Sequence, residues 1–128
     1  MKNLNIIAAT IISVVMLATS AFAQDFQKGF EAYNAGDYAT ALQEWRPLAE
    51  QGNARVQTLL GIMYLRGEGV LQDNVLAHMW LNLGAANGHE LGAKNRDIIA
   101  KKMTPQAIEQ AQKMARECMS KDYKNCGY

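Results

Sequence analysis

The residues best suited to chemistry in this sequence are two histidines, His78 and His89, and two cysteines, Cys118 and Cys126. A histidine acts as a general base when a nucleophile and an orienting carboxylate lie beside it. Neither histidine has such residues at a spacing that would bring the three groups together. His78 falls in a strongly apolar segment and is predicted to be a polar residue at the edge of a core. His89 directly follows Gly88 and is predicted to start a helix, so we expect no catalytic residue.

The two cysteines lie eight residues apart near the end of the chain and are its only ones. In an oxidising compartment Cys118 and Cys126 would close a small loop, and we predict a disulfide. The alternative is that Cys118 is a buried apolar residue and Cys126 a free thiol. Two cysteines without a neighbouring histidine cannot complete a tetrahedral zinc site. We therefore expect no metal and no cofactor.

The first 23 residues have the composition of a secretory signal peptide. A single lysine precedes the apolar run of residues 6–18, and residues 21–23, Ala-Phe-Ala, form a small-x-small cleavage site. We expect cleavage after Ala23, a domain of residues 24–128, and a location in the periplasm or outside the cell. A permanent anchor is the alternative, but the run is short for a bilayer core of about 30 Å. No stable membrane span is expected after cleavage.

Length and composition are those of one small globular domain. The 128 residues suffice for one hydrophobic core and are too few for two ordinary domains. Hydrophobic residues make up 49% and charged residues 20%, with a formal net charge of +1. A chain with so little net charge has no strong electrostatic attraction to phosphate backbones, so we expect no nucleic-acid partner.

An internal repeat organises the chain. An offset of 36 residues superposes Asp37 on Asp73 and Gly52 on Gly88. In each copy the aspartate can cap the start of a helix, and the glycine can end that helix in the left-handed conformation. Apolar residues recur at helical spacing in six segments, and no segment is a strand candidate. Repeats of about 20 to 50 residues built from helix pairs indicate an all-α solenoid.

The segment from Leu60 to Gly88, LGIMYLRGEGVLQDNVLAHMWLNLGAANG, resembles the Sel-one-like repeat, a relative of the tetratricopeptide repeat with a longer loop inside the helix pair. Residues 35–54 resemble the second half of a preceding unit, and residues 96–117 resemble the closing helices of small exported bacterial members. Leu71 and Gly84 depart from the family's usual residues. The resemblance implies a short right-handed α-solenoid of antiparallel helix pairs, about two and a half repeats, with a C-terminal closing helix.

The repeat positions are expected to hold the helix pairs together. They are Tyr38, Ala41, Trp45, Tyr64, Gly67, Gly69, Asp73, Ala77, Trp80, Ala85 and Gly88. A ligand-stacking role for the aromatic residues among them is the alternative, but they lie on apolar stripes at helical spacing, which favours a core. Gly67 and Gly69 predict a turn rather than a dinucleotide-binding loop, because such a loop needs a third glycine and a preceding strand.

The resemblance also implies a protein-interaction role, in which the domain binds another protein or peptide as an adaptor or scaffold in the cell envelope. Two alternatives remain at this point. One is a weak hydrolase of cell-wall or β-lactam substrates, an activity proposed for some cysteine-rich members of the family. The other is a structural protein that associates with itself into a homo-oligomer.

In repeats of this type the first helix of each pair lines a concave surface, which is the expected binding site. In the best-defined first helix the residues opposite the core stripe are Arg55, Thr58, Ile62 and Leu65. The repeat offsets add Gln27, Glu31, Asn34, Lys94, Ile98 and Lys101. Ile62 and Leu65 are the expected apolar anchors. Packing against the neighbouring helix pair is an equal alternative for these two, and Ile98 has core burial as its alternative.

Overall fold

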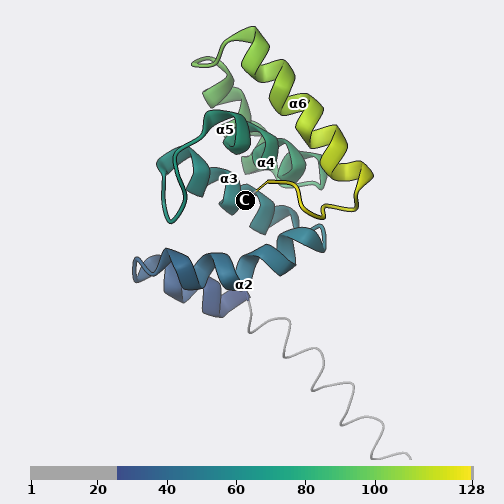
Figure 1. Ribbon diagram of the computed structural model, residues 1–128. Coiled ribbons are helices and arrows are strands. Elements are labelled where there is room, and N and C mark those ends of the chain that lie inside the picture. Colours follow the sequence, from purple (N-terminus) through teal and green to yellow (C-terminus); the bar gives the residue numbers. More distant parts are fainter. Residues whose placement is uncertain (1–25, 128) are drawn as a thin grey trace, which may run out of the picture.

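The computed structural model describes residues 26–127, and all regular structure within this range is helical (Figure 1). Residues 26–34 form an N-terminal helix. Five helices follow: α2 (Tyr38–Glu50), α3 (Ala54–Arg66), α4 (Asn74–Ala86), α5 (Glu90–Ala100) and α6 (Pro105–Ser120). The predicted all-α class is therefore confirmed for the part of the chain that the structure describes.

The expected signal peptide, residues 1–23, and its cleavage site lie outside the described residues. Within residues 26–127, no helix has the length and apolar character needed to cross a bilayer.

The repeat found in the sequence corresponds to a repeated pair of helix ends. The Asp37 carboxylate accepts a hydrogen bond from the amide of Thr40 and so caps α2, and the Asp73 carboxylate caps α4 in the same way. Gly52 and Gly88 follow these helices with φ values of +84° and +99°, which side-chain-bearing residues rarely adopt. The same local chemistry therefore begins and ends α2 and α4.

Consecutive helices from α2 to α5 pack against each other, and two further contacts skip one helix. α3 contacts α5, and α4 contacts α6 as well as α3 and α5. In Figure 1 the N-terminal helix and α2 lie together at one end of the molecule, and α6 lies at the other. α4 is thus central, as its apolar composition predicts.

The core contains the large residues that the periodicity selected. Trp45 and Trp80 are both fully buried, and Tyr64 is nearly so. Of the remaining repeat positions, Ala41 and Ala77 are buried, whereas Tyr38, Asp73 and Ala85 are partly exposed and Gly67, Gly69 and Gly88 lie in exposed turns.

Glycines allow α3, α4 and α5 to approach each other closely. A Cβ at Gly92 would lie 2.8 Å from both the Ala85 amide nitrogen and the Leu81 carbonyl oxygen of α4. A Cβ at Gly84 would lie 2.9 Å from the Ala54 carbonyl and would also overlap the hydroxyl of Thr58. This close contact explains why position 84 is a glycine.

Candidate functional site

His89 forms the N-cap of α5, as predicted, and joins this helix to α3. Its Nδ1 lies 2.9 Å from the Thr58 hydroxyl, which lies 3.0 Å from the Ala54 carbonyl oxygen. The hydroxyl has one proton and donates it to Ala54, so Nδ1 must carry a proton and donate to Thr58. This arrangement ties the start of α5 to α3.

His78 is buried, with only 3% of its surface exposed, and does not lie at the edge of the core as we predicted. Its position on the central helix α4 accounts for the difference. Burial lowers the pKa of His78, the positive charge of Arg96 lowers it further, and Asp97 partly opposes both effects. Its Nδ1 has no hydrogen-bond partner among the described atoms. The ring is therefore neutral at neutral pH, but no nucleophile lies in hydrogen-bond contact with that nitrogen.

We expect the stability of the domain to depend on the protonation of His78. The lowered pKa means that, below the unfolded-state value of 6.5, the unfolded chain binds more protons than the folded one. The free energy of unfolding should therefore decrease as pH falls from 6.5 through the folded-state pKa. Urea unfolding of the wild type and of His78→Gln, measured between about pH 7 and pH 5, tests this expectation. A difference in stability between the two proteins that stays constant with pH would contradict it.

The aromatic residues considered as a ligand-stacking box lie in the core. The indole N–H of Trp45 donates to the carbonyl of Phe26 at 3.2 Å, and that of Trp80 donates to the carbonyl of Gly127 at 3.3 Å. Both rings are fully buried, so neither presents a face to a ligand.

The predicted disulfide is present. The Sγ atoms of Cys118 and Cys126 lie 2.06 Å apart, and neither cysteine is free. The alternative with a free thiol at Cys126 is therefore wrong. Among residues 26–127, no group of three or more His, Cys, Asp or Glu side chains is placed to hold a metal ion.

The expected concave surface is only partly exposed. Thr58 is buried, which corrects its place in the expected binding set, because Gly84 and Gly92 bring α4 and α5 close to it. Ile62 and Leu65 are half-buried and pack against the core.

The remaining residues of the expected set lie at the surface. Arg55 is exposed and places its guanidinium 4.6 Å from the centre of the Phe26 ring. The others are also exposed: Gln27, Glu31, Asn34, Lys94, Ile98 and Lys101. Gln27 donates to the carboxylate of Glu31 at 3.0 Å, so these two side chains form a local pair on the N-terminal helix.

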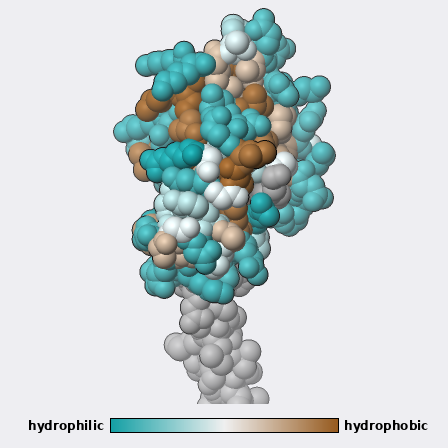
Figure 2. Space-filling view, turned by 60° about the vertical axis from the view of Figure 1, so that its left-hand side comes forward, coloured by the Kyte–Doolittle hydropathy of each residue, from teal (hydrophilic) through white to brown (hydrophobic). Residues whose placement is uncertain are grey.

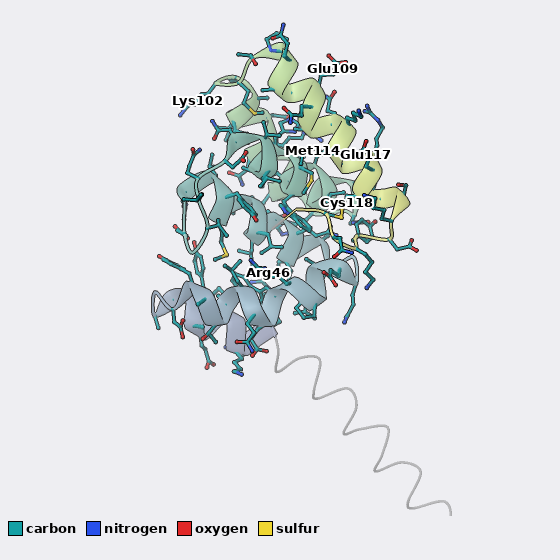
Figure 3. The ribbon with its side chains drawn as sticks, in the orientation of Figure 1. Arg46, Lys102, Glu109, Met114, Glu117 and Cys118 are labelled. Carbon is teal, nitrogen blue, oxygen red and sulfur yellow. A yellow bond between two sulfur atoms is a disulfide. The ribbon has the colours of Figure 1, made fainter. Side chains whose placement is uncertain are left out.

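The outer face of α5 combines exposed aliphatic side chains with lysines. The side chain of Leu91 is 54% exposed and that of Ile98 is 56% exposed. The two residues are about two helical turns apart, so they lie on the same side of α5. Lys94 lies between them in sequence and forms a 3.4 Å ion pair with Glu90. Lys101 and Lys102 follow directly after the helix, and Lys102 points away from the fold in Figure 3. We call Leu91, Lys94, Ile98, Lys101 and Lys102 the α5 face.

Leu91 was not among the expected binding residues, although its spacing from Ile98 indicates that the two lie on the same side of the helix. The sequence could not show that this side remains uncovered, because that depends on where α6 packs. In the structure α5 buries Gly92 and Ile99 against its neighbours, while α6 packs mainly on α4.

A second apolar feature lies beside the loop between α3 and α4. Its pocket of about 350 Å³ is lined by Tyr64, Val70, Leu71, Asp73 and Leu76. Leu71 is 91% exposed, and brown apolar side chains also reach the surface among hydrophilic ones in Figure 2. The side-chain oxygen of Asp73 that faces α4 is already engaged in capping that helix.

Comparison with known proteins found no matching family model, curated protein or solved structure.

Proposed function

We propose that this chain is an exported protein-binding module of the Sel-one-like type, a short right-handed α-solenoid of about two and a half helix pairs with a closing helix. The contacts of α3 with α5 and of α4 with α6 support this arrangement. In stacked helix pairs, first helices contact first helices and second helices contact second helices. The matching caps at Asp37 and Asp73 support a repeated unit.

The proposed binding site is the α5 face, and its composition carries the proposal. Solvated helix surfaces seldom combine large aliphatic residues on one side, and apolar anchors dominate the energetics of protein interfaces. Leu91 and Ile98 would supply such anchors, while the neighbouring lysines favour a partner with acidic side chains. The partner is thus a protein or peptide segment with aliphatic and acidic residues.

Export fits the covalent chemistry of the domain. The Cys118–Cys126 disulfide forms and persists in oxidising compartments, and the first 23 residues carry the signal-peptide pattern. We place the mature domain in the periplasm or outside the cell, and we propose no catalytic activity for it. Turnover of a cell-wall or β-lactam substrate by the purified chain would contradict this part of the proposal.

We expect Leu91→Asp and Ile98→Asp to weaken partner binding roughly tenfold or more each, because each removes an apolar anchor worth about 1.4 kcal/mol or more. A photo-crosslinking residue at position 94 would first capture the partner in its native compartment. Titration of the purified partner against each variant would then measure the affinity. The melting curves should hardly move, because both side chains are more than half exposed.

Leu71→Asp is the matched control, since it places the same charge at an exposed leucine away from α5. It should leave the affinity unchanged. Equal binding by the wild type and both α5 variants would refute the proposed site. Sedimentation of the wild type as an oligomer that these variants dissociate would instead support self-association through this face.

A further inference from the structure

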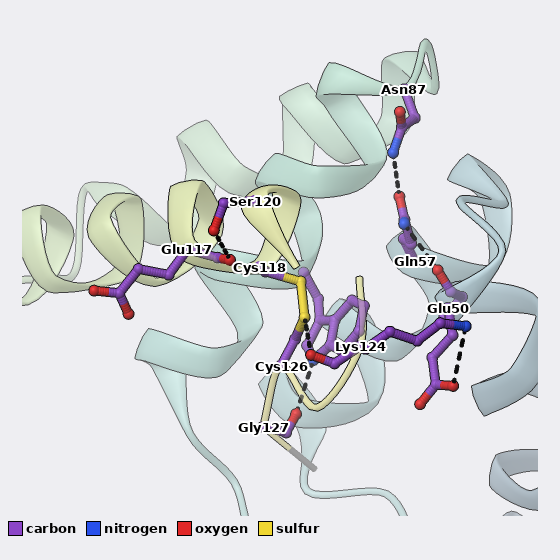
Figure 4. Close-up of a disulfide and its surroundings, with 11 residues drawn as sticks. Glu50, Gln57, Asn87, Glu117, Cys118, Ser120, Lys124, Cys126 and Gly127 are labelled. Atoms are coloured by element: carbon purple, nitrogen blue, oxygen red, sulfur yellow. Dashed lines mark hydrogen bonds and ion pairs between the residues drawn. A yellow bond between two sulfur atoms is a disulfide. The ribbon is translucent and has the colours of Figure 1, made fainter. Parts of the chain in front are cut away.

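The C-terminal segment that follows α6 turns back over the body of the domain. Residues 121–127, which we call the C-terminal strap, contain no helix and end beside the disulfide, because Cys126 is bonded to Cys118 in the last turns of α6 (Figure 4). The strap begins with local backbone hydrogen bonds, such as that from the Tyr123 amide to the Cys118 carbonyl at 2.9 Å. Its path is thus fixed at both ends by the same cysteine pair.

Polar contacts tie the strap to two helices, α4 and α2. The Tyr123 hydroxyl donates to the side-chain oxygen of Asn87 at 3.1 Å, directly after α4. Lys124 lies 3.9 Å from the carboxylate of Glu50 at the end of α2, and both side chains are partly solvated. The carbonyl of Gly127 accepts the indole N–H of Trp80. Partly solvated contacts of this kind contribute little each.

The backbone of the strap opposes these contacts. Asp122, Tyr123 and Asn125 have φ values of +52°, +62° and +52°, in the left-handed region that disfavours residues other than glycine. Asparagine and aspartate tolerate this region, whereas tyrosine has no such side-chain compensation. The disulfide therefore holds a segment with an unfavourable backbone conformation against the domain, together with weak polar contacts and the packing of Tyr123 against the core.

The disulfide can be reached from solvent by a small thiol. Its two cysteines are largely shielded, Cys118 being 1% and Cys126 8% exposed, yet both line an open pocket of about 220 Å³. Lys121 also lines this pocket, and its ammonium group favours an incoming thiolate. Glu117 and Met114 complete the side of the pocket on α6, where Figure 3 labels both.

We propose that the Cys118–Cys126 disulfide is a reversible exchange site for a small dithiol, and that its reduction releases the strap while the helices stay folded. The dithiol's thiolate attacks the Sγ of Cys126, the more exposed of the two cysteines, the sulfur–sulfur bond breaks, and Cys118 leaves as a thiolate that takes a proton from water. The second thiol of the reductant then displaces Cys126 from the mixed disulfide. The products are two cysteine thiols and the cyclic disulfide of the reductant, which has supplied both electrons.

Release of the strap alters the surface of α4 and leaves the α5 face unchanged. Trp80 loses its hydrogen bond to Gly127, and Leu76, which lies beside Gly127, loses the cover of the strap. The packing of α4 against α3, α5 and α6 involves none of the strap residues and is expected to persist. This inference does not depend on the partner proposed for α5.

Nuclear magnetic resonance of the two indole N–H groups tests the proposal directly, because the chain has two tryptophans. The oxidised chain is treated with dithiothreitol without denaturant, and alkylation followed by mass spectrometry confirms two free thiols. We expect hydrogen exchange of the Trp80 indole to speed up at least tenfold, that of Trp45 to change less than twofold, and the far-ultraviolet circular dichroism to remain. The variant with both Cys118→Ser and Cys126→Ser should reproduce the reduced state.

Three results would overturn the proposal. Thiols that form only in denaturant would show that the site is closed to exchange. Loss of helical circular dichroism on reduction would show that the disulfide holds the whole domain rather than the strap. Unchanged exchange at Trp80 in both the reduced chain and the double serine variant would show that the strap stays in place without its crosslink.

Discussion

Replacing Trp80 with alanine is expected to lower the free energy of unfolding by about 3 to 5 kcal/mol, the range for removing a large aromatic side chain from a core. Trp80 is fully buried on α4, the helix that contacts α3, α5 and α6. Because small domains have total free energies of unfolding of only about 5 to 15 kcal/mol, this loss removes a large part of the stability of the domain. Chemical denaturation followed by circular dichroism measures it.

Leu71→Ala provides the comparison for Trp80→Ala, since that leucine is 91% exposed and its removal should change stability by less than about 0.5 kcal/mol. A Trp80→Ala protein as stable as the wild type would mean that Trp80 packs against no core. It would also revive the ligand-stacking interpretation of the aromatic residues.

Helix ends could be predicted because their chemistry is local. An aspartate that caps a helix bonds to an amide two or three residues later, as Asp73 does with Val75 and Leu76, so the sequence alone contains both partners. Gly88 ends α4 through its own backbone torsion, a positive φ, so this signal is also local in the sequence. The repeat of these local signals, together with the helical periodicity, predicted the all-helical class, and the apolar composition of α4 predicted its central position.

The side on which α3 is exposed could not be predicted, because it depends on residues far along the chain. Thr58 is buried since His89, 31 residues later, bonds to its hydroxyl and since Gly92 of α5 packs beside it. A helical wheel of α3 contains none of this information. The same holds for His78, because α4 packs against α3, α5 and α6, and these contacts lie outside its own sequence pattern.

The disulfide was predictable, but the position of its loop was not. Cys118 and Cys126 are close in sequence, so pairing them requires no knowledge of the fold. The hydrogen bond from the Trp80 indole to the Gly127 carbonyl joins residues 47 apart, and no pattern in the sequence relates the two. Long-range contacts of this kind determine which helix sides remain exposed, and therefore where a partner can bind.

Trp45→Ala is expected to have an effect of similar size but at one end of the molecule. The Trp45 ring is fully buried and packs against the aromatic residues of the N-terminal helix, with ring centres 6.1 Å from Phe26 and 5.6 Å from Tyr33. Gly29 lies against the indole so closely that no Cβ would fit there. Removal of the indole should therefore cost about 3 to 5 kcal/mol in the docking of residues 26–34.

If helix pairs are stacked so that each contacts only its neighbours, this loss stays local. Hydrogen exchange should show amides of residues 26–34 losing protection in Trp45→Ala, while amides of α4 and α6 keep theirs. Trp45→Phe is the matched control, because it keeps a ring in place and loses the hydrogen bond to the Phe26 carbonyl, which is worth about 1 kcal/mol. Equal loss of protection along all six helices in Trp45→Ala would identify one cooperative unit and contradict the stacked arrangement.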